Sequence, residues 1–190
     1  MSEQGTNQLS EVNAGNIRKC VITSNSGKAV DVSGGLVDFR YYENVLSNVV
    51  TATAVIVDTG YASDGQKAKG AKGILDDLPI RGGERFDIDF LDSGNPQHSL
   101  QLTFYVNRVL AGDPGTVKET FILHLTSLAY IGNELTRVVK RYQGKISDNV
   151  KSILSDVLQS DEEVIVDDTA IDYNFFGNDR KPLYVCTWLA

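Results

Sequence analysis

The sequence predicts a mainly β fold, an antiparallel β-barrel or sandwich, with an α+β part at its C-terminal end. Three observations lead to this fold class. Between residues 17 and 125 the chain carries about seven short strand patterns separated by turn residues. No long helical pattern interrupts them, which favours antiparallel pairing over βαβ units. Beyond Thr126 the periodicity changes, and an amphipathic helix follows at residues 146–158.

The composition indicates an ordinary globular protein. At 190 residues, with 42% hydrophobic and 23% charged residues, the chain can bury a core without crosslinks. The formal net charge of -7 argues against a general nucleic-acid binder, because phosphate binding requires a basic surface. Cys20 and Cys186 are far apart and lack CxxC spacing, so we expect two small core residues rather than a disulfide framework or a zinc site.

The N-terminal residues 1–15 are rich in Gly, Asn, Gln and Ser, and we expect a flexible lead-in there. They contain no apolar segment typical of a secretory signal. No apolar run approaches the ~18 residues of a membrane span. The sequence therefore predicts synthesis in the cytoplasm and no membrane partner.

The first strands are predicted by β-branched runs and turn residues. A run at 17–23 ends in a Ser-Asn-Ser-Gly turn, and 29–32 can return as its partner strand. Alternating apolar residues support a strand at 36–41, and the run at 49–57 is the strongest β pattern in the chain. These elements predict a meander of strands.

The later strands follow a Gly-, Lys- and Asp-rich segment at 58–79. Residues 84–91 alternate cleanly between apolar and charged, as in a half-buried strand. The pattern repeats at 102–106, and a Gly-Asp-Pro-Gly turn leads to 121–125, so the last two strands are expected to form a hairpin. A sheet of this size must bury one face and protect its edges, which favours a closed barrel or a sandwich.

The amphipathic helix has one apolar face and a candidate N-cap at Ser147 or its neighbour. Residues 161–190 are expected to cover that face. The face consists of Ile146, Val150, Ile153, Leu154, Val157 and Leu158.

Opposite charges flank this helix. The segment 161–172 is acidic and contains no Lys or Arg, whereas four basic residues come just before the helix. We interpret these basic residues as candidates for a subunit interface, where they could pair with an acidic surface. They are Arg137, Lys140, Arg141 and Lys145.

The last residues, 183–190, are strongly apolar and are expected to begin a new helix. Because natural termini are usually polar or frayed, we expect the chain to be the N-terminal piece of a longer protein. The predicted organisation is a flexible segment at 1–15, a β-domain at 16–133, and a junction strand, helix and start of a second domain at 134–190.

Catalytic and ligand-binding motifs are not found. The Gly- and Lys-rich stretch 65–72 lacks the Gly-Lys-Ser/Thr order of a phosphate-binding loop. The two histidines, His98 and His124, form no metal-binding pair, and no Gly-x-Ser-x-Gly elbow is present. Asp87 and Asp89 share a strand face, but simple alternation explains their spacing. We therefore predict no enzyme, no metal, no cofactor and no catalytic residue.

The order of these features resembles a known family. A Gly-Gly-Glu strand entry is followed by a Leu-x-Phe-x-Val strand, a strand ending in Leu-x-Leu-Thr-Ser, and the junction with its helix. The quoted stretches are 82–88, 102–106, 123–127, 139–148 and 174–178, with Pro182 and Trp188-Leu189 beyond them. This order resembles the N-terminal part of tail baseplate hub proteins of contractile-tailed bacteriophages, which are similar in fold to spike-base proteins of type VI secretion.

The resemblance implies a structural virion protein located in the tail baseplate. Residues 16–133 would form a tail-tube-like barrel, and a second barrel later in the chain would let a homotrimer mimic a six-fold ring. Such a hub subunit connects the tail tube protein to the central spike protein. DNA passes through its lumen without specific binding, which an acidic wall would favour.

Two other functions remain open on the sequence alone. The first alternative is a standalone β-barrel module that binds a small molecule or a carbohydrate. The second is a hydrolase, which would depend on His98 or His124. A deep apolar pocket would favour the binding module.

Overall fold

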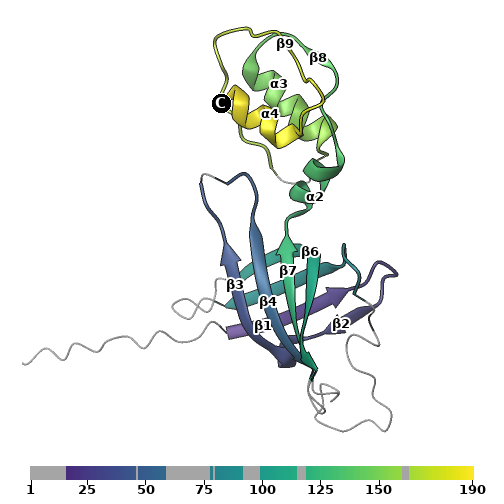
Figure 1. Cartoon of the computed structure of the whole chain (residues 1–190). Coiled ribbons are helices and arrows are strands. Elements are labelled where there is room, and N and C mark those ends of the chain that lie inside the picture. The colour runs from purple at the N-terminus through teal and green to yellow at the C-terminus, as the bar shows by residue number, and fades with distance from the viewer. Residues whose placement is uncertain are drawn as a thin grey trace, which may run out of the picture.

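The computed structural model contains a curved β-sheet and, beyond one end of it, a smaller unit of helices (Figure 1). The predicted flexible segment 1–15 and most of the predicted loop 58–79 lie outside the described residues. The structure describes residues 16–45, 47–58, 78, 80–91, 99–114, 119–159 and 163–190.

The sheet has seven antiparallel strands in the order β2-β1-β5-β6-β7-β4-β3. Each of the seven predicted strand patterns falls on one of them, and the predicted hairpin is β6-β7. The prediction of a mainly antiparallel β fold is therefore confirmed. The strands are β1 (Asn16–Thr23), β2 (Ala29–Asp31), β3 (Leu36–Tyr42), β4 (Thr51–Asp58), β5 (Arg85–Leu91), β6 (Ser99–Pro114) and β7 (Glu119–Thr126).

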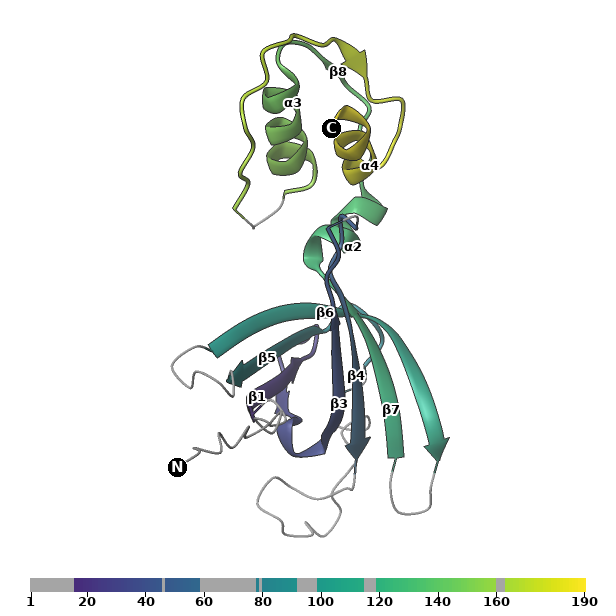
Figure 2. The same ribbon diagram turned by 90° about the vertical axis from the view of Figure 1, so that its left-hand side faces the viewer.

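The sheet bends at β6, which has 16 residues and pairs with two different neighbours. Residues 99–105 pair with β5, and residues from 105 onward pair with β7. The register shifts between Val106 and Arg108, which is the position of a β-bulge. The bend folds the two halves of the sheet toward each other (Figure 2).

A closed barrel was expected, but the sheet is open, with β2 and β3 at its edges. The chain passes directly from β2 to β3 through the short 3-10 helix η1 (Ser33–Gly35), which contacts both β1 and β4. No ladder joins the two edges among the described residues. Aromatic packing links β3 to the interior strand β5 instead: the ring of Phe39 on β3 lies 6.2 Å from Phe86 and 5.5 Å from Phe90.

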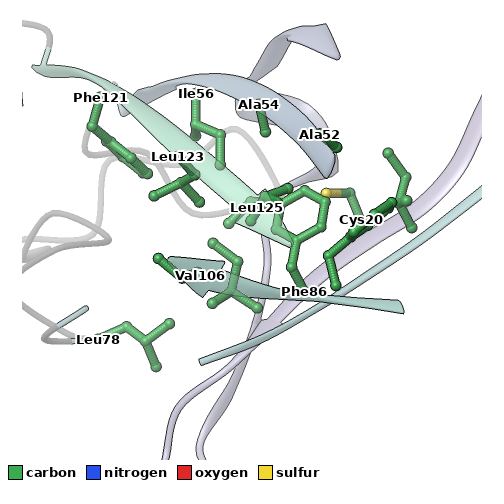
Figure 3. Close-up of a cluster of buried hydrophobic side chains, with 14 residues drawn as sticks. Cys20, Ala52, Ala54, Ile56, Leu78, Phe86, Val106, Phe121, Leu123 and Leu125 are labelled. Atoms are coloured by element: carbon green, nitrogen blue, oxygen red, sulfur yellow. The ribbon is translucent and has the colours of Figure 1, made fainter. Parts of the chain in front are cut away.

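The core lies between the two halves of the bent sheet (Figure 3). Its side chains come from alternate positions, as in β4, where every second residue is buried. Cys20 is among them, as expected for a small core residue. The buried set is Cys20, Ile22, Val32, Ala52, Ala54, Ile56, Leu78, Phe86, Ile88, Phe104, Val106, Phe121, Leu123 and Leu125.

The Gly-Gly-Glu entry to β5 is a hydrogen-bonded turn. Glu84 is 1% exposed, and its carboxylate accepts hydrogen bonds from the backbone N–H of Arg81 at 2.7 Å and of Gly82 at 2.8 Å. Gly83 donates to the carbonyl of Val106 at 2.7 Å. The two glycines have φ values of 117° and 84°, which residues with a side chain rarely adopt. The buried carboxylate therefore fixes the turn beside the bend of β6.

Replacing this carboxylate should destabilise the sheet. Glu84→Gln removes one acceptor and places an amide N–H against a backbone N–H, so we expect a loss of about 1–3 kcal/mol in the free energy of unfolding. Urea denaturation measures the loss. Glu43→Gln is the control, because Glu43 is exposed and the amide can still accept from the Tyr41 hydroxyl. Equal stability of the two variants would contradict this role for Glu84.

The smaller unit contains three helices and a two-stranded sheet. The predicted helix at 146–158 is confirmed, although its second half is a π-helical turn, and the predicted C-terminal helix is also present. The helix α2 was not predicted. The elements are α2 (Leu128–Leu135), β8 (Arg141–Tyr142), α3 (Ile146–Ser152), η2 (Ile153–Val157), β9 (Phe175–Phe176) and α4 (Pro182–Leu189).

A separate core holds this unit together. Residues 161–190 were expected to cover the apolar face of the amphipathic helix, and β9 and α4 cover it at Ile153 and Val157. Gly177 approaches this core so closely that a Cβ atom there would lie 2.2 Å from the carbonyl oxygen of Val138. The buried set is Val138, Tyr142, Ile153, Phe175 and Val185, with Val157, Cys186 and Leu189 packed against it.

The start of α3 is capped from a distant part of the chain. Ser147 or its neighbour was predicted as the N-cap, but Lys145 occupies that position and makes no side-chain cap. The backbone N–H of Ser147 donates to the Thr169 hydroxyl at 3.1 Å, and the N–H of Thr169 donates to the Ser147 hydroxyl at 3.3 Å. This exchange fastens the segment that follows η2 to the helix.

A methyl group at Gly177 should loosen the smaller unit. Because the added Cβ would clash with backbone rather than with a flexible side chain, we expect Gly177→Ala to cost about 1–3 kcal/mol of stability. Thermal or urea unfolding followed by Trp188 fluorescence measures it. Gly34→Ala is the control, since a Cβ there meets nothing within 4 Å. A neutral Gly177→Ala would show that this close contact is not required.

Candidate interaction surfaces

The smaller unit exposes four aromatic side chains, which we call the aromatic face. The exposed fractions are 43% for Tyr173, 54% for Phe176, 55% for Tyr184 and 54% for Trp188. The ring of Trp188 lies 5.9 Å from Tyr173 and 5.8 Å from the buried Phe175. The packing therefore holds these rings in place. Clustered exposed aromatic rings are typical of protein interaction sites.

A shallow pocket of about 180 Å³ opens on this face, and we call it the Arg180 pocket. The guanidinium of Arg180 lies 5.6 Å from the ring centre of Tyr184. The pocket is presented by a tight turn in which Asn178 and Asp179 have φ values of 50° and 57° and Arg180 donates to the Gly177 carbonyl. Its lining includes Phe175, Phe176, Arg180, Tyr184, Val185 and Trp188.

The four predicted basic residues make different local contacts. The Arg137 guanidinium donates to the carbonyls of Glu134 and Thr136, just after α2. Lys140 lies 4.9 Å from the ring centre of Tyr142, while Arg141 and Lys145 are exposed. In the part of the chain that the structure describes, none of the four forms an ion pair. Their role at a subunit interface remains a prediction.

Two ion pairs form in the smaller unit. Their basic residues are not among the four predicted interface residues. Lys151 pairs with Asp168 at 3.2 Å, and Lys181 pairs with Glu134. The nearby carboxyl of Asp156 has a lowered pKa because the hydroxyls of Ser152 and Ser155 donate to it, with a smaller contribution from the charge of Lys140. The described charged residues on either side of the helix are exposed to solvent.

The outer edge of β3 is a second exposed surface, the β3 edge. Val37 is 68% exposed and Tyr42 is 51% exposed on this strand. Within the described residues β3 pairs only with β4, so one row of its backbone groups carries no ladder partner. Free strand edges are templates for pairing with another chain.

Other candidate residues have ordinary surroundings. Asp87 accepts hydrogen bonds from Arg85 at 2.9 Å and from the Thr103 hydroxyl at 2.7 Å. His124 is half-buried on the face of β7 opposite the core. His98 and the stretch 65–72 lie outside the described residues.

Neither cysteine has the surroundings of a reactive thiol. Both are unpaired, and burial raises the pKa of Cys20 to about 12 and that of Cys186 to about 11. No group of His, Cys, Asp and Glu side chains suited to a metal ion occurs among the residues with defined positions. Of the helices described, none is long and apolar enough to cross a membrane.

The fold is similar to that of two solved tail proteins, one of them from a prophage. No protein-family model and no curated protein matches the sequence. The 43 kDa tail protein of prophage MuSo2 from Shewanella oneidensis matches 90% of this chain with a TM-score of 0.56 and 11% identity. A tail protein from Neisseria meningitidis MC58 matches 90% of the chain with a TM-score of 0.50 and 11% identity. The chain spans 48% and 44% of these two proteins, about half their length, and shares their fold over that part.

Proposed function

We propose that this chain is a structural component of a phage tail, and specifically a baseplate hub subunit that joins the tail tube to the central spike. The observation that carries the proposal is the fold similarity, which extends over 90% of the chain and therefore includes both the sheet and the smaller unit. The aromatic face and the β3 edge support a role in assembly, because both are surfaces suited to protein partners.

The bent sheet is suited to a ring. It leaves two edges, β2 and β3, on the same domain, and head-to-tail contacts between different edges close into a ring when the rotation permits. We propose a homotrimer in which each sheet acts as a tube-like domain. The net charge of -7 would disfavour binding of DNA to the inner wall of the assembly, because like charges repel.

The partners in this proposal are the tail tube protein on one side and the central spike protein on the other. All four predicted basic residues are exposed and remain candidates for contacts between subunits, namely Arg137, Lys140, Arg141 and Lys145. The proposed role is structural and requires neither catalysis nor a cofactor. The proposed location is the tail baseplate of the virion.

A small-molecule binding module is the weaker alternative. The interior between the two halves of the sheet is filled by side chains such as Phe86 and Phe121, both fully buried. The Arg180 pocket lies on the smaller unit, and its volume of about 180 Å³ is below the ~300–1,000 Å³ typical of ligand pockets. Protein contacts therefore explain the exposed aromatic rings better than a bound metabolite does.

Assembly of the purified protein tests the proposal. We expect trimers or rings in mass photometry and negative-stain electron microscopy, and we expect the protein in purified particles by immunogold labelling. A strictly monomeric protein that is also absent from the particles would contradict the proposal.

The β3 edge should contribute to this assembly. A Lys at the exposed edge opposes strand pairing, so we expect Val37→Lys to weaken self-association about tenfold without unfolding the sheet. Val45→Lys is the control, because Val45 is 98% exposed but lies at the tip between β3 and β4. Equal association of both variants would exclude the β3 edge as an interface.

A further inference from the structure

We propose that the Arg180 pocket receives the extended acidic segment 163–168 of a second copy, with Ile165 as the side chain that enters it. The inference rests on the proposed self-assembly and gives it a specific contact. It follows from the size of the pocket, its unbalanced charge, the exposure of Ile165 and the separation of the two surfaces on one chain.

The size of the pocket favours a side chain. A volume of about 180 Å³ is too small for a typical metabolite but is suited to one branched aliphatic group. The rings of Phe176, Tyr184 and Trp188 form apolar walls that are about half exposed. Covering these walls would remove apolar surface from water, which is the main source of favourable energy in association.

The charge of the pocket favours an acidic neighbour for that side chain. Arg180 is the charged residue in the lining, and it forms no ion pair with another described residue. Its planar group is held over the Tyr184 ring, which leaves its N–H groups available to a carboxylate. Covering a guanidinium without a carboxylate partner would be costly, so the occupant should bring one.

The segment 163–168 supplies both features. It belongs to no helix or strand, and from Glu163 to Asp167 exposed residues alternate with half-buried ones, as in an extended chain. Ile165 is 84% exposed, an unusual position for an isoleucine in a folded chain. Glu163 and Asp167 lie two residues to either side and are exposed, so in an extended chain they point to the same side as Ile165.

The segment of one chain is held away from its own pocket. Thr169 is bonded to Ser147 and Asp168 to Lys151, which fixes the segment along α3. Figure 2 shows this segment on the side of α3 that faces away from α4, which carries part of the pocket. The contact would therefore join two different surfaces on two chains. Such head-to-tail contacts continue from copy to copy, and they close into a ring when the rotation between copies permits.

Trp188 provides a direct readout, because it is the single tryptophan of the chain and lines the pocket. In the full chain at low salt, we expect its emission to shift to the blue as concentration rises, in parallel with association in sedimentation velocity. High salt should weaken both signals, since the contact includes ion pairs. Ile165→Asp and Arg180→Glu should each weaken association about tenfold or more.

Ile171→Asp is the matched control, because Ile171 is 72% exposed but lies outside the segment. We expect this variant to associate like the unmodified protein. All these side chains are exposed or half-exposed, so circular dichroism should show an unchanged fold.

Mixing the two defective variants tests the head-to-tail geometry. Ile165→Asp retains an intact pocket and Arg180→Glu retains an intact segment, so an equimolar mixture should form heterodimers but no larger rings. In these heterodimers the Trp188 emission of the Ile165→Asp chain should shift. A mixture that stays monomeric would overturn the proposed contact.

Two further results would overturn the inference. The first is an unmodified protein whose Trp188 emission does not change while it associates. The second is an Ile165→Asp variant that assembles like the unmodified protein. Either would leave the hub assembly standing through other surfaces, whereas absence of the protein from purified particles would count against the proposed function itself.

Discussion

The fold of the β-domain depends on the bend of β6 at Val106. At this position the strand leaves β5 and continues beside β7, and the backbone of Val106 exchanges hydrogen bonds with Gly83 and Glu84. The Gly-Gly-Glu turn therefore fixes the bend through backbone hydrogen bonds from a neighbouring segment. The turn itself is stabilised by the hydrogen bonds that the buried Glu84 carboxylate accepts. Without the bend the apolar faces of the two halves would not meet, and they would stay in water.

The local patterns were enough to predict each strand of the sheet, but not whether the sheet closes. Alternation of apolar residues reports which face of a strand is buried. The same alternation does not show whether β2 pairs with β3 and closes the sheet. Closure depends on the three-residue length of β2 and on η1, which connects the two strands. The helix α2 was missed for a similar reason. Its Asn133 is unusual in a helix interior, and it is explained only by the bond that its side chain accepts from the N–H of Leu183, 50 residues away.

The candidate surfaces were harder to predict than the fold. The C-terminal apolar run correctly predicted a helix, but its composition could not distinguish Val185, which is buried, from Trp188, which is 54% exposed. The predicted apolar stripe of the amphipathic helix is buried only at Ile153 and Leu158 and half-buried at its other positions.

The two units have separate cores that share no residue, and this separation shapes what the chain can do in an assembly. Asn133 and Glu134 tie α2 to the start of α4, so α2 packs as part of the smaller unit. The sheet meets it through the backbone bond from Ser127 to Val50. An interface made through the β3 edge would therefore bury little of the smaller unit. Under the proposed function, the sheet and the aromatic face would therefore give the chain two separate surfaces for neighbouring subunits.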